Sequence, residues 1–193
     1  MAARARNRDY RALSVFATDR YTGVAILLHW LIALLVFVLI GLGWYMVDIP
    51  KNTPERSYFY NLHKSIGLTT LALILVRVGW RLTHVPPRLP ASLKTWEVVA
   101  STWSHRLLYV CLLVMPLSGY VASNFTKFGV KYFGIELPPW GPEDKTLYGI
   151  FNNVHVATSF IFVALIALHV AAAFKHLLVD RDAVFRRILP GRG

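Results

Sequence analysis

A long apolar run near the C-terminus, residues 154–174, places the strongest constraint on how this chain can fold. The run is interrupted only by His155, Thr158, Ser159 and His169. It is long enough to cross a bilayer as a single helix. Ionisable side chains inside such a span are costly and usually functional, so the two histidines require an explanation.

The spacing of His155 and His169 places both rings on one face of that helix. Their separation corresponds to an angular offset of ~40° and a rise of ~21 Å. One ring therefore lies near each membrane surface, an arrangement that suits two haems stacked across the membrane. The alternative is two core histidines, each hydrogen-bonded to a neighbouring helix, and this segment alone leaves both interpretations open.

Composition places the whole chain in a membrane. Of its 193 residues, 55% are apolar and only 16% are charged, which is typical of integral membrane proteins and not of soluble domains. The single cysteine, Cys111, lies in an apolar run and excludes a disulfide framework. The chain has no C-x-x-C-H motif, so any haem must be held by coordination and packing without thioether links.

Hydropathy along the chain predicts an all-α fold, an integral membrane four-helix transmembrane bundle. The expected spans are residues 23–47, 57–81, 101–125 and 146–174, and the third helix is expected to start ahead of its span, at about residue 95. They belong to one membrane domain, residues 23–176, which lies between a basic N-terminal tail (1–22) and a basic C-terminal tail (177–193). The Arg-rich N-terminal tail is assigned no role. The longest loop, residues 126–145, is expected to fold over one membrane face.

The distribution of charge predicts the orientation of the spans. Four spans place both termini on the same side of the membrane. The two tails and the loop between the second and third spans carry, with their flanks, 15 Lys and Arg and 5 Asp and Glu, whereas the other two loops carry 6 and 5. The positive-inside rule therefore predicts that both termini are cytoplasmic. The net charge of +11 is then explained first by the topology. Binding of acidic lipid headgroups is the second explanation, and no nucleic-acid partner is expected.

Two further histidines match the depths of those on the fourth span. In this topology His29 lies near the cytoplasmic surface with His169, and His63 lies near the outer surface with His155. Four histidines from three helices at two levels favour haem ligation over four unrelated core roles. Neutral imidazole is a standard haem ligand, and two per iron leave no open position, which favours electron transfer over oxygen binding.

The remaining histidines lie close to or beyond the membrane boundary. His105 and His176 are at the level of the inner haem edge, where contact with haem propionates, an anionic substrate or a quinone suits them better than iron ligation. They are, with Arg88, the candidates for a catalytic role. His84 lies in a loop and is expected to be solvated.

Cationic side chains accompany both haem levels. Arg77 and Arg81 end the second span on the inner side, and Lys64 follows His63 on the outer side. These groups can contact propionates or a quinone, and a cationic patch beside a haem edge can draw in an anion such as superoxide. The alternative is that they only pair with propionates and lipid phosphates.

Several segments occur in an order that is typical of one protein family. They are LLHW in the first span, LHKSIG in the second, HRLLYVCLLVMPLSGY in the third, the His155 and His169 pair in the fourth, and the closing KHLLVDRD. In these segments the chain resembles the prokaryotic cytochrome b561 family over about residues 21–190. No single motif is very specific, but their order and spacing together are.

The resemblance implies a di-haem cytochrome b domain in the bacterial inner membrane. Two b haems would be held by His29, His63, His155 and His169, and electrons would be exchanged with ubiquinone. Some members resemble superoxide oxidase, which passes an electron from superoxide to quinone. The alternative function is a cytochrome b membrane subunit that relays electrons for a partner dehydrogenase or hydrogenase. A haem-free scaffold is the third class, and a red purified protein would exclude it.

Overall fold

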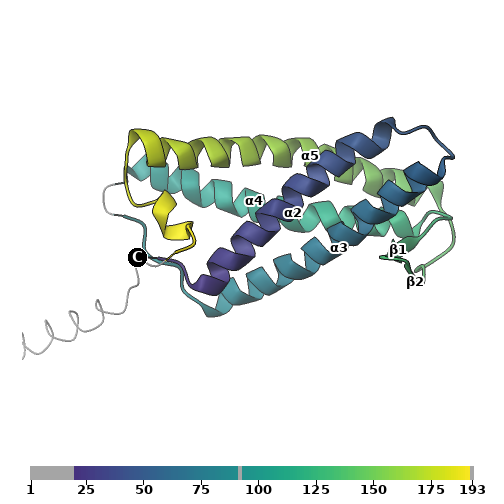
Figure 1. The fold of residues 1–193 in the computed structure, drawn as a ribbon, viewed down its shortest axis with the longest axis horizontal. Coiled ribbons are helices and arrows are strands. Elements are labelled where there is room, and N and C mark those ends of the chain that lie inside the picture. The colour runs from purple at the N-terminus through teal and green to yellow at the C-terminus, as the bar shows by residue number, and fades with distance from the viewer. Residues whose placement is uncertain (1–19, 91–92, 192–193) are drawn as a thin grey trace, which may run out of the picture.

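Four long helices run side by side in an elongated bundle (Figure 1). The computed structural model describes residues 20–90 and 93–191; Arg4, Arg6, Arg8 and Arg11 of the predicted N-terminal tail lie outside them. The helices are α2 (Gly23–Asp48), α3 (Pro54–Thr83), α4 (Thr95–Asn124) and α5 (Lys145–Phe174). All four are long and apolar enough to cross a membrane, which confirms the predicted all-α membrane bundle.

Side-chain caps set where the helices begin. Thr22 Oγ1 accepts a hydrogen bond from the amide of Ala25 at 3.3 Å and so opens α2. Thr53 caps α3 in the same way, directly before Pro54, a residue that suits the first helical position because its missing N–H is not needed there. The Asp144 carboxylate accepts from two amides in the first turn of α5. These caps satisfy amide groups that would otherwise lack partners at the helix ends.

Three of the four predicted spans agree with their helices to within three residues, and α4 begins at Thr95, where the third helix is expected to start ahead of its span. The Glu97 carboxylate accepts from the Lys94 amide at 3.0 Å and from the Lys175 ammonium at 2.8 Å, so this first turn is stabilised by polar contacts that hydropathy does not detect. At this same end of the bundle α5 continues as a short π-helix, η1 (Lys175–Val179).

The bundle has a small buried core at mid-depth, built by all four helices. Its members are Ile32, Val36, Ile74, Cys111 and Phe162. Packing is most extensive between α4 and α5 and then between α2 and α3, whereas α2 and α5 make few close backbone contacts. The two halves of the bundle meet through α3 and α4, whereas α2 and α5 face each other mainly through side chains, among them histidines described below.

A small β-hairpin that the sequence analysis did not predict lies in the loop between α4 and α5. Strands β1 (Val130–Tyr132) and β2 (Ile135–Leu137) are antiparallel, with Val130 opposite Leu137. The turn uses Phe133 and Gly134, which have φ angles of 46° and 94°. Three-residue strands produce no alternating pattern long enough to recognise, although the loop does fold against the bundle as expected. We call this end of the molecule the hairpin end.

Ser65 anchors the hairpin to α3. Its side chain is almost fully buried, with 1% of the residue exposed. The hydroxyl lies 2.8 Å from the carbonyl of Asn61 and 3.0 Å from that of Lys131, and it accepts from the Phe133 amide at 2.9 Å. Ser65, which lies two residues after His63, therefore fixes the position of β1 along α3.

The opposite end, which we call the tail end, is closed by the C-terminal segment. A short 3-10 helix, η2 (Phe185–Ile188), folds back onto the start of α2. The Trp30 indole donates to the Ile188 carbonyl at 2.7 Å, and the Tyr21 amide donates to the Arg187 carbonyl at 3.3 Å. Arg187 is itself buried and donates to the Arg88 carbonyl at 2.5 Å. The described part of the predicted C-terminal tail is thus a packed element of the bundle.

We predict that Ser65→Ala loosens the hairpin while leaving the bundle intact. The change removes the acceptor of a part-buried hydrogen bond from the Phe133 amide, which costs about 0.5–1.5 kcal/mol of local stability. Hydrogen exchange of residues 130–137 should therefore be faster. Ser159→Ala is the matched control, because that hydroxyl donates to the Val156 carbonyl within its own helix. Equal exchange in the two variants would show that Ser65 does not anchor the hairpin.

Candidate functional site

At the hairpin end, two histidines from different helices face each other. The ring centres of His63 on α3 and His155 on α5 are 6.2 Å apart, and the ring planes meet at 82°. Two glycines give the rings room. A Cβ atom on Gly119 would lie 2.8 Å from His155 Nδ1, and one on Gly43 would lie 3.6 Å from His63 Cε1. A side chain at residue 119 would therefore displace the His155 ring.

The His155 ring is oriented by a backbone hydrogen bond to α4. Its Nδ1 lies 2.8 Å from the Met115 carbonyl oxygen. A carbonyl only accepts, so Nδ1 carries the proton, and in the neutral ring Nε2 then keeps its lone pair for a metal. Histidines that bind metals usually donate their other N–H in this way. The bond would also suit a core histidine, so His155 alone fits both interpretations.

His63 distinguishes those two interpretations. Among the described residues, its Nδ1 is the one buried side-chain N or O atom that has no hydrogen-bond partner. A core histidine that serves only packing would be expected to have its polar atoms satisfied, because an unpaired buried group is costly. A ring whose role is to bind an external group explains this orphaned atom better.

At the tail end, three histidines from three helices cluster. The ring centres of His29 on α2 and His169 on α5 are 6.3 Å apart, with an interplanar angle of 66°. His105 on α4 approaches the same His169 ring edge-on, at 5.4 Å between ring centres. The Trp30 ring packs edge-on against His29 at 5.3 Å. Through its indole N–H bond, Trp30 links this cluster to η2.

The two clusters are related by a fourteen-residue spacing on every helix, which corresponds to one continuous face. The tail-end level holds His29, Arg77, His105 and His169, and the hairpin-end level holds Gly43, His63, Gly119 and His155. On α5 the buried Phe162 lies midway between the two histidines. The helices therefore present two levels along one face, with Phe162 midway between the two histidines of α5.

The spacing of each facing pair fits one metal ion held between two imidazoles. Metal–nitrogen bonds of about 2 Å, with ~1 Å more from each nitrogen to its ring centre, give ring centres about 6 Å apart. Both facing pairs have this separation. Together with the orphaned His63 nitrogen and the space left by the glycines, this spacing shows that the residues present fit two bis-imidazole haems.

Cationic groups lie around the tail-end level. Arg77 Nη1 donates to the Ala25 carbonyl at 2.9 Å and so links α3 to α2. Arg77 and Arg81 both lie close enough to act electrostatically on His105. His105 Nδ1 lies 2.7 Å from the Ser101 carbonyl, so its Nε2 is the nitrogen available to an external group. The structure thus brings together three of the residues expected at the inner end.

His176 and Arg88, the other two inner candidates, contact the C-terminal segment. His176 Nδ1 is bonded to the carboxylates of Asp182 at 2.8 Å and Asp180 at 3.1 Å. These three side chains form a donor set that could hold a metal ion, but Lys175 already places its ammonium 2.6 Å from Asp180. The cluster therefore secures the turn after α5. Arg88 is exposed, and its backbone carbonyl accepts a hydrogen bond from the Arg187 guanidinium.

Lys64 and His84 also have local partners. The Lys64 ammonium donates to the Gly129 carbonyl at 2.8 Å, which fastens the start of the hairpin beside His63. His84 is exposed, as expected, and it stacks on Trp80 with ring centres 3.7 Å apart. The pairing of His29 with His169 and of His63 with His155 thus agrees with the depths inferred from the sequence, whereas the contacts of the flanking residues could not be foreseen.

Sequence reasoning missed Gly119, Phe162 and the contact of Trp30 with the tail. A signal existed for the first two, because each lies at a seven- or fourteen-residue interval from a histidine on its own helix. Trp30 enters the sequence analysis only as the last residue of the LLHW segment. Its bond to Ile188 joins residues that are 158 positions apart, and no local pattern indicates such a contact.

Comparison with known proteins agrees with this geometry. The family model described as prokaryotic cytochrome b561 matches residues 20–191. Cytochrome b561 homolog 2 of Escherichia coli (strain K12) is 27% identical over 172 residues, which cover 89% of this chain and 92% of that protein. Cytochrome b561 homolog 1 of the same strain is 23% identical over 178 residues, covering 90% and 99%.

A third relative carries a more specific name. A probable superoxide oxidase CybB of Yersinia pestis is 24% identical over 174 residues, which cover 89% of this chain and 96% of that protein. The four membrane helices, the two histidine levels and a family match over nearly the whole chain lead to one conclusion. The protein belongs to the prokaryotic cytochrome b561 family of haem b-binding membrane proteins that transfer electrons.

Proposed function

We propose that the protein is a di-haem cytochrome b that exchanges electrons with ubiquinone in the inner membrane. His29 and His169 would hold one b haem, and His63 and His155 would hold the other. The observation that carries this proposal is the near-identical separation of the two facing pairs, 6.3 and 6.2 Å, on a shared helix face. The haem iron supplies the one-electron chemistry.

The protein's own residues would restrict that chemistry to electron transfer. Two imidazoles per iron leave no position for oxygen. The bond from His155 to the Met115 carbonyl fixes one of these rings against α4. Phe162, buried between the levels, excludes water from the space between the two sites. Electrons would therefore pass between the membrane faces without exposure of the iron to small ligands.

The substrate would react at the tail-end level. His105, Arg77 and Arg81 approach the His29 and His169 pair from two other helices. Fixed cations stabilise negative charge that develops on a quinone during reduction, and they do so more strongly in a dry pocket than in water. The catalytic candidates remain His105, His176 and Arg88, with Lys64 as the corresponding cation at the hairpin end. The relationship to the Yersinia protein favours superoxide as the electron donor.

We predict two low-spin b haems per chain, lost in defined pairs. His63→Ala and His155→Ala should each remove the same haem, and His29→Ala and His169→Ala should each remove the other. A pyridine-haem count and the dithionite-reduced spectrum measure both outcomes. His84→Ala is the matched control and should keep two haems, because that ring is exposed and stacks on Trp80. Loss of one common haem in the His29 and His63 variants would disprove the pairing.

We predict that both termini are cytoplasmic, because the basic residues concentrate on that side. Alkaline phosphatase fused after Pro190 should be inactive, since the enzyme matures only outside the cytoplasm. The same enzyme fused after Lys51, between α2 and α3, should be active. The reverse pattern would exchange the two membrane faces and place the tail-end level at the outer surface.

We predict that His105 and His176 serve the substrate and do not bind iron. His105→Ala and His176→Ala should keep both haems and the reduced spectrum, yet slow quinone-coupled turnover. His176→Ala also releases Asp182, so Asp182→Asn serves as the control that weakens the same contact but keeps the imidazole. Loss of a haem would make either histidine a ligand or a structural support. Unchanged turnover in the double variant would move the reaction to the hairpin end, near Lys64.

A further inference from the structure

The C-terminal segment joins the two helices that carry the tail-end histidine pair. After η1 the chain turns back, and η2 lies between the end of α5 and the start of α2 (Figure 1). These two helices carry His169 and His29, whose ring centres are 6.3 Å apart, yet they make few close backbone contacts with each other. The C-terminal segment therefore adds a connection that direct packing of α2 on α5 supplies only weakly.

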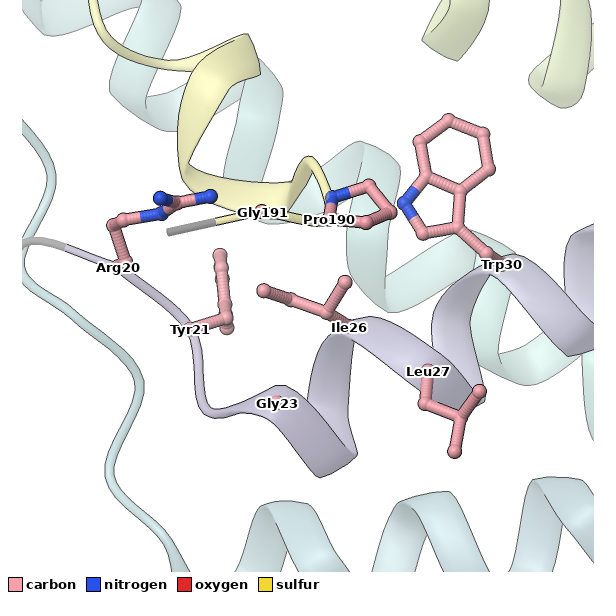
Figure 2. A pocket seen from close by; sticks show the side chains of 8 residues that line it. All are labelled: Arg20, Tyr21, Gly23, Ile26, Leu27, Trp30, Pro190 and Gly191. Atoms are coloured by element: carbon pink, nitrogen blue, oxygen red, sulfur yellow. The ribbon is translucent and has the colours of Figure 1, made fainter. Parts of the chain in front are cut away.

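On the α2 side, this connection runs through Trp30. The indole N–H donates to the Ile188 carbonyl at 2.7 Å, and Figure 2 shows the indole nitrogen turned toward the segment that carries Pro190. The same ring packs edge-on against the neighbouring His29 ring, with ring centres 5.3 Å apart and ring planes at 78°. One side chain thus contacts both the C-terminal segment and a proposed haem ligand.

On the α5 side, the connection runs through Phe185 of η2. Its ring stacks on that of Phe174, with ring centres 6.4 Å apart and planes 24° apart, a separation within the range of attractive aromatic pairs. Phe174 is the last residue of α5 and lies five residues after His169, a rise of about 7.5 Å along the helix. The stack therefore holds η2 against the part of α5 that follows His169.

Further contacts fix the C-terminal segment itself. The Tyr21 amide donates to the Arg187 carbonyl at 3.3 Å. The Arg187 side chain is buried and donates to the Arg88 carbonyl at 2.5 Å. The Asp182 carboxylate accepts from the Val184 amide at 2.9 Å and so shapes the turn that leads into η2. A segment that is held at several points along its length can transmit a constraint from one helix to the other.

We propose that residues 185–190 form a strap that positions the imidazoles of His29 and His169 for the tail-end haem, with Trp30 as the positioning residue on α2. This inference rests on the proposed function, because it concerns the haem that this pair would hold. Groups that contact a metal-binding histidine orient its ring, and their loss weakens metal binding by about 10- to 100-fold. The hairpin-end pair lies at the other end of the bundle, so the strap acts on one haem only.

The test follows each haem separately in the full-length, haem-loaded protein. His63→Ala and His29→Ala first assign the two low-spin signals in the electron paramagnetic resonance spectrum to the tail-end and hairpin-end levels. Trp30→Leu should then shift the tail-end signal and hold that haem at least about tenfold more weakly, measured as faster loss to excess apomyoglobin. The hairpin-end haem should keep its wild-type signal and rate of loss, and it reports in the same molecule that the bundle is folded.

An isosteric replacement separates the strap contact from simple packing. Trp30→3-benzothienylalanine keeps a bicyclic ring beside His29 but replaces the N–H group by sulfur, so the bond to the Ile188 carbonyl is lost. This variant should also shift the tail-end signal. Trp44→Leu is the matched control, because this tryptophan is 62% exposed near the other end of α2. Both haems should stay as in the wild type.

Phe185→Ala tests whether the strap acts through Trp30. It removes the stack on Phe174 without touching either histidine of the pair, and it should weaken retention of the tail-end haem. In a Trp30→Leu background the same change should have little further effect, because two changes on one path are not additive. Full additivity would show that the two aromatic residues act separately, and it would overturn the strap.

The remaining outcomes divide between this inference and the proposed function. If His29 and His169 share a haem, but Trp30→Leu leaves its signal and retention unchanged, the strap is wrong and the proposed function stands. Equal changes at both levels would make Trp30 a general packing residue and would also overturn the strap. A wild-type protein that holds no haem at the His29 and His169 pair would overturn both proposals.

Discussion

The close approach of α5 to α4 at His155 determines the rest of the arrangement. The ring donates to the Met115 carbonyl at 2.8 Å and passes directly over Gly119, where even a methyl group would collide with it. In lipid, helices gain little from burying apolar surface against one another, so small residues and interhelical hydrogen bonds decide which helices pack closely. This contact fixes the depth and rotation of α5, and with them the positions of Phe162 and His169 on the same face.

Once the position of α5 is fixed, the fourteen-residue spacing on the other helices places their residues at the same two levels as His155 and His169. Each helix contributes one residue to each level: His29 and Gly43 on α2, and His105 and Gly119 on α4. Large rings on one helix are met by glycine on another, which leaves room around the hairpin-end pair. α2 and α5 make few close backbone contacts. In the proposed arrangement, a haem held by His29 and His169 would occupy the space between these two helices. Bound haem should therefore contribute to stability as well as to function.

The spans and the pairing of histidines by depth could be predicted because both depend on periodicities within single helices. Apolar length predicted α2, α3 and α5 closely, and equal distances from helix ends matched His63 with His155. The remaining features depend on contacts between distant segments. Ser65 holds a hairpin that is 68 residues away at Phe133, and Trp30 holds a carbonyl that is 158 residues away. Such pairs leave no local pattern.

The two ends of the bundle are closed in different ways, and this difference bears on how a two-level electron carrier can work. At the hairpin end, Ser65 and Lys64 bind the backbone of the hairpin beside His63, so a covering element lies over that level from the aqueous side. At the tail end, η2 folds over the start of α2, where the Trp30 indole holds it. A water-borne reactant would therefore meet polar backbone and lysine at the hairpin end, whereas a reactant at the tail end would meet His105 and the nearby arginines Arg77 and Arg81. An electron that crosses between the levels would then connect a reactant at one end of the bundle with a reactant at the other.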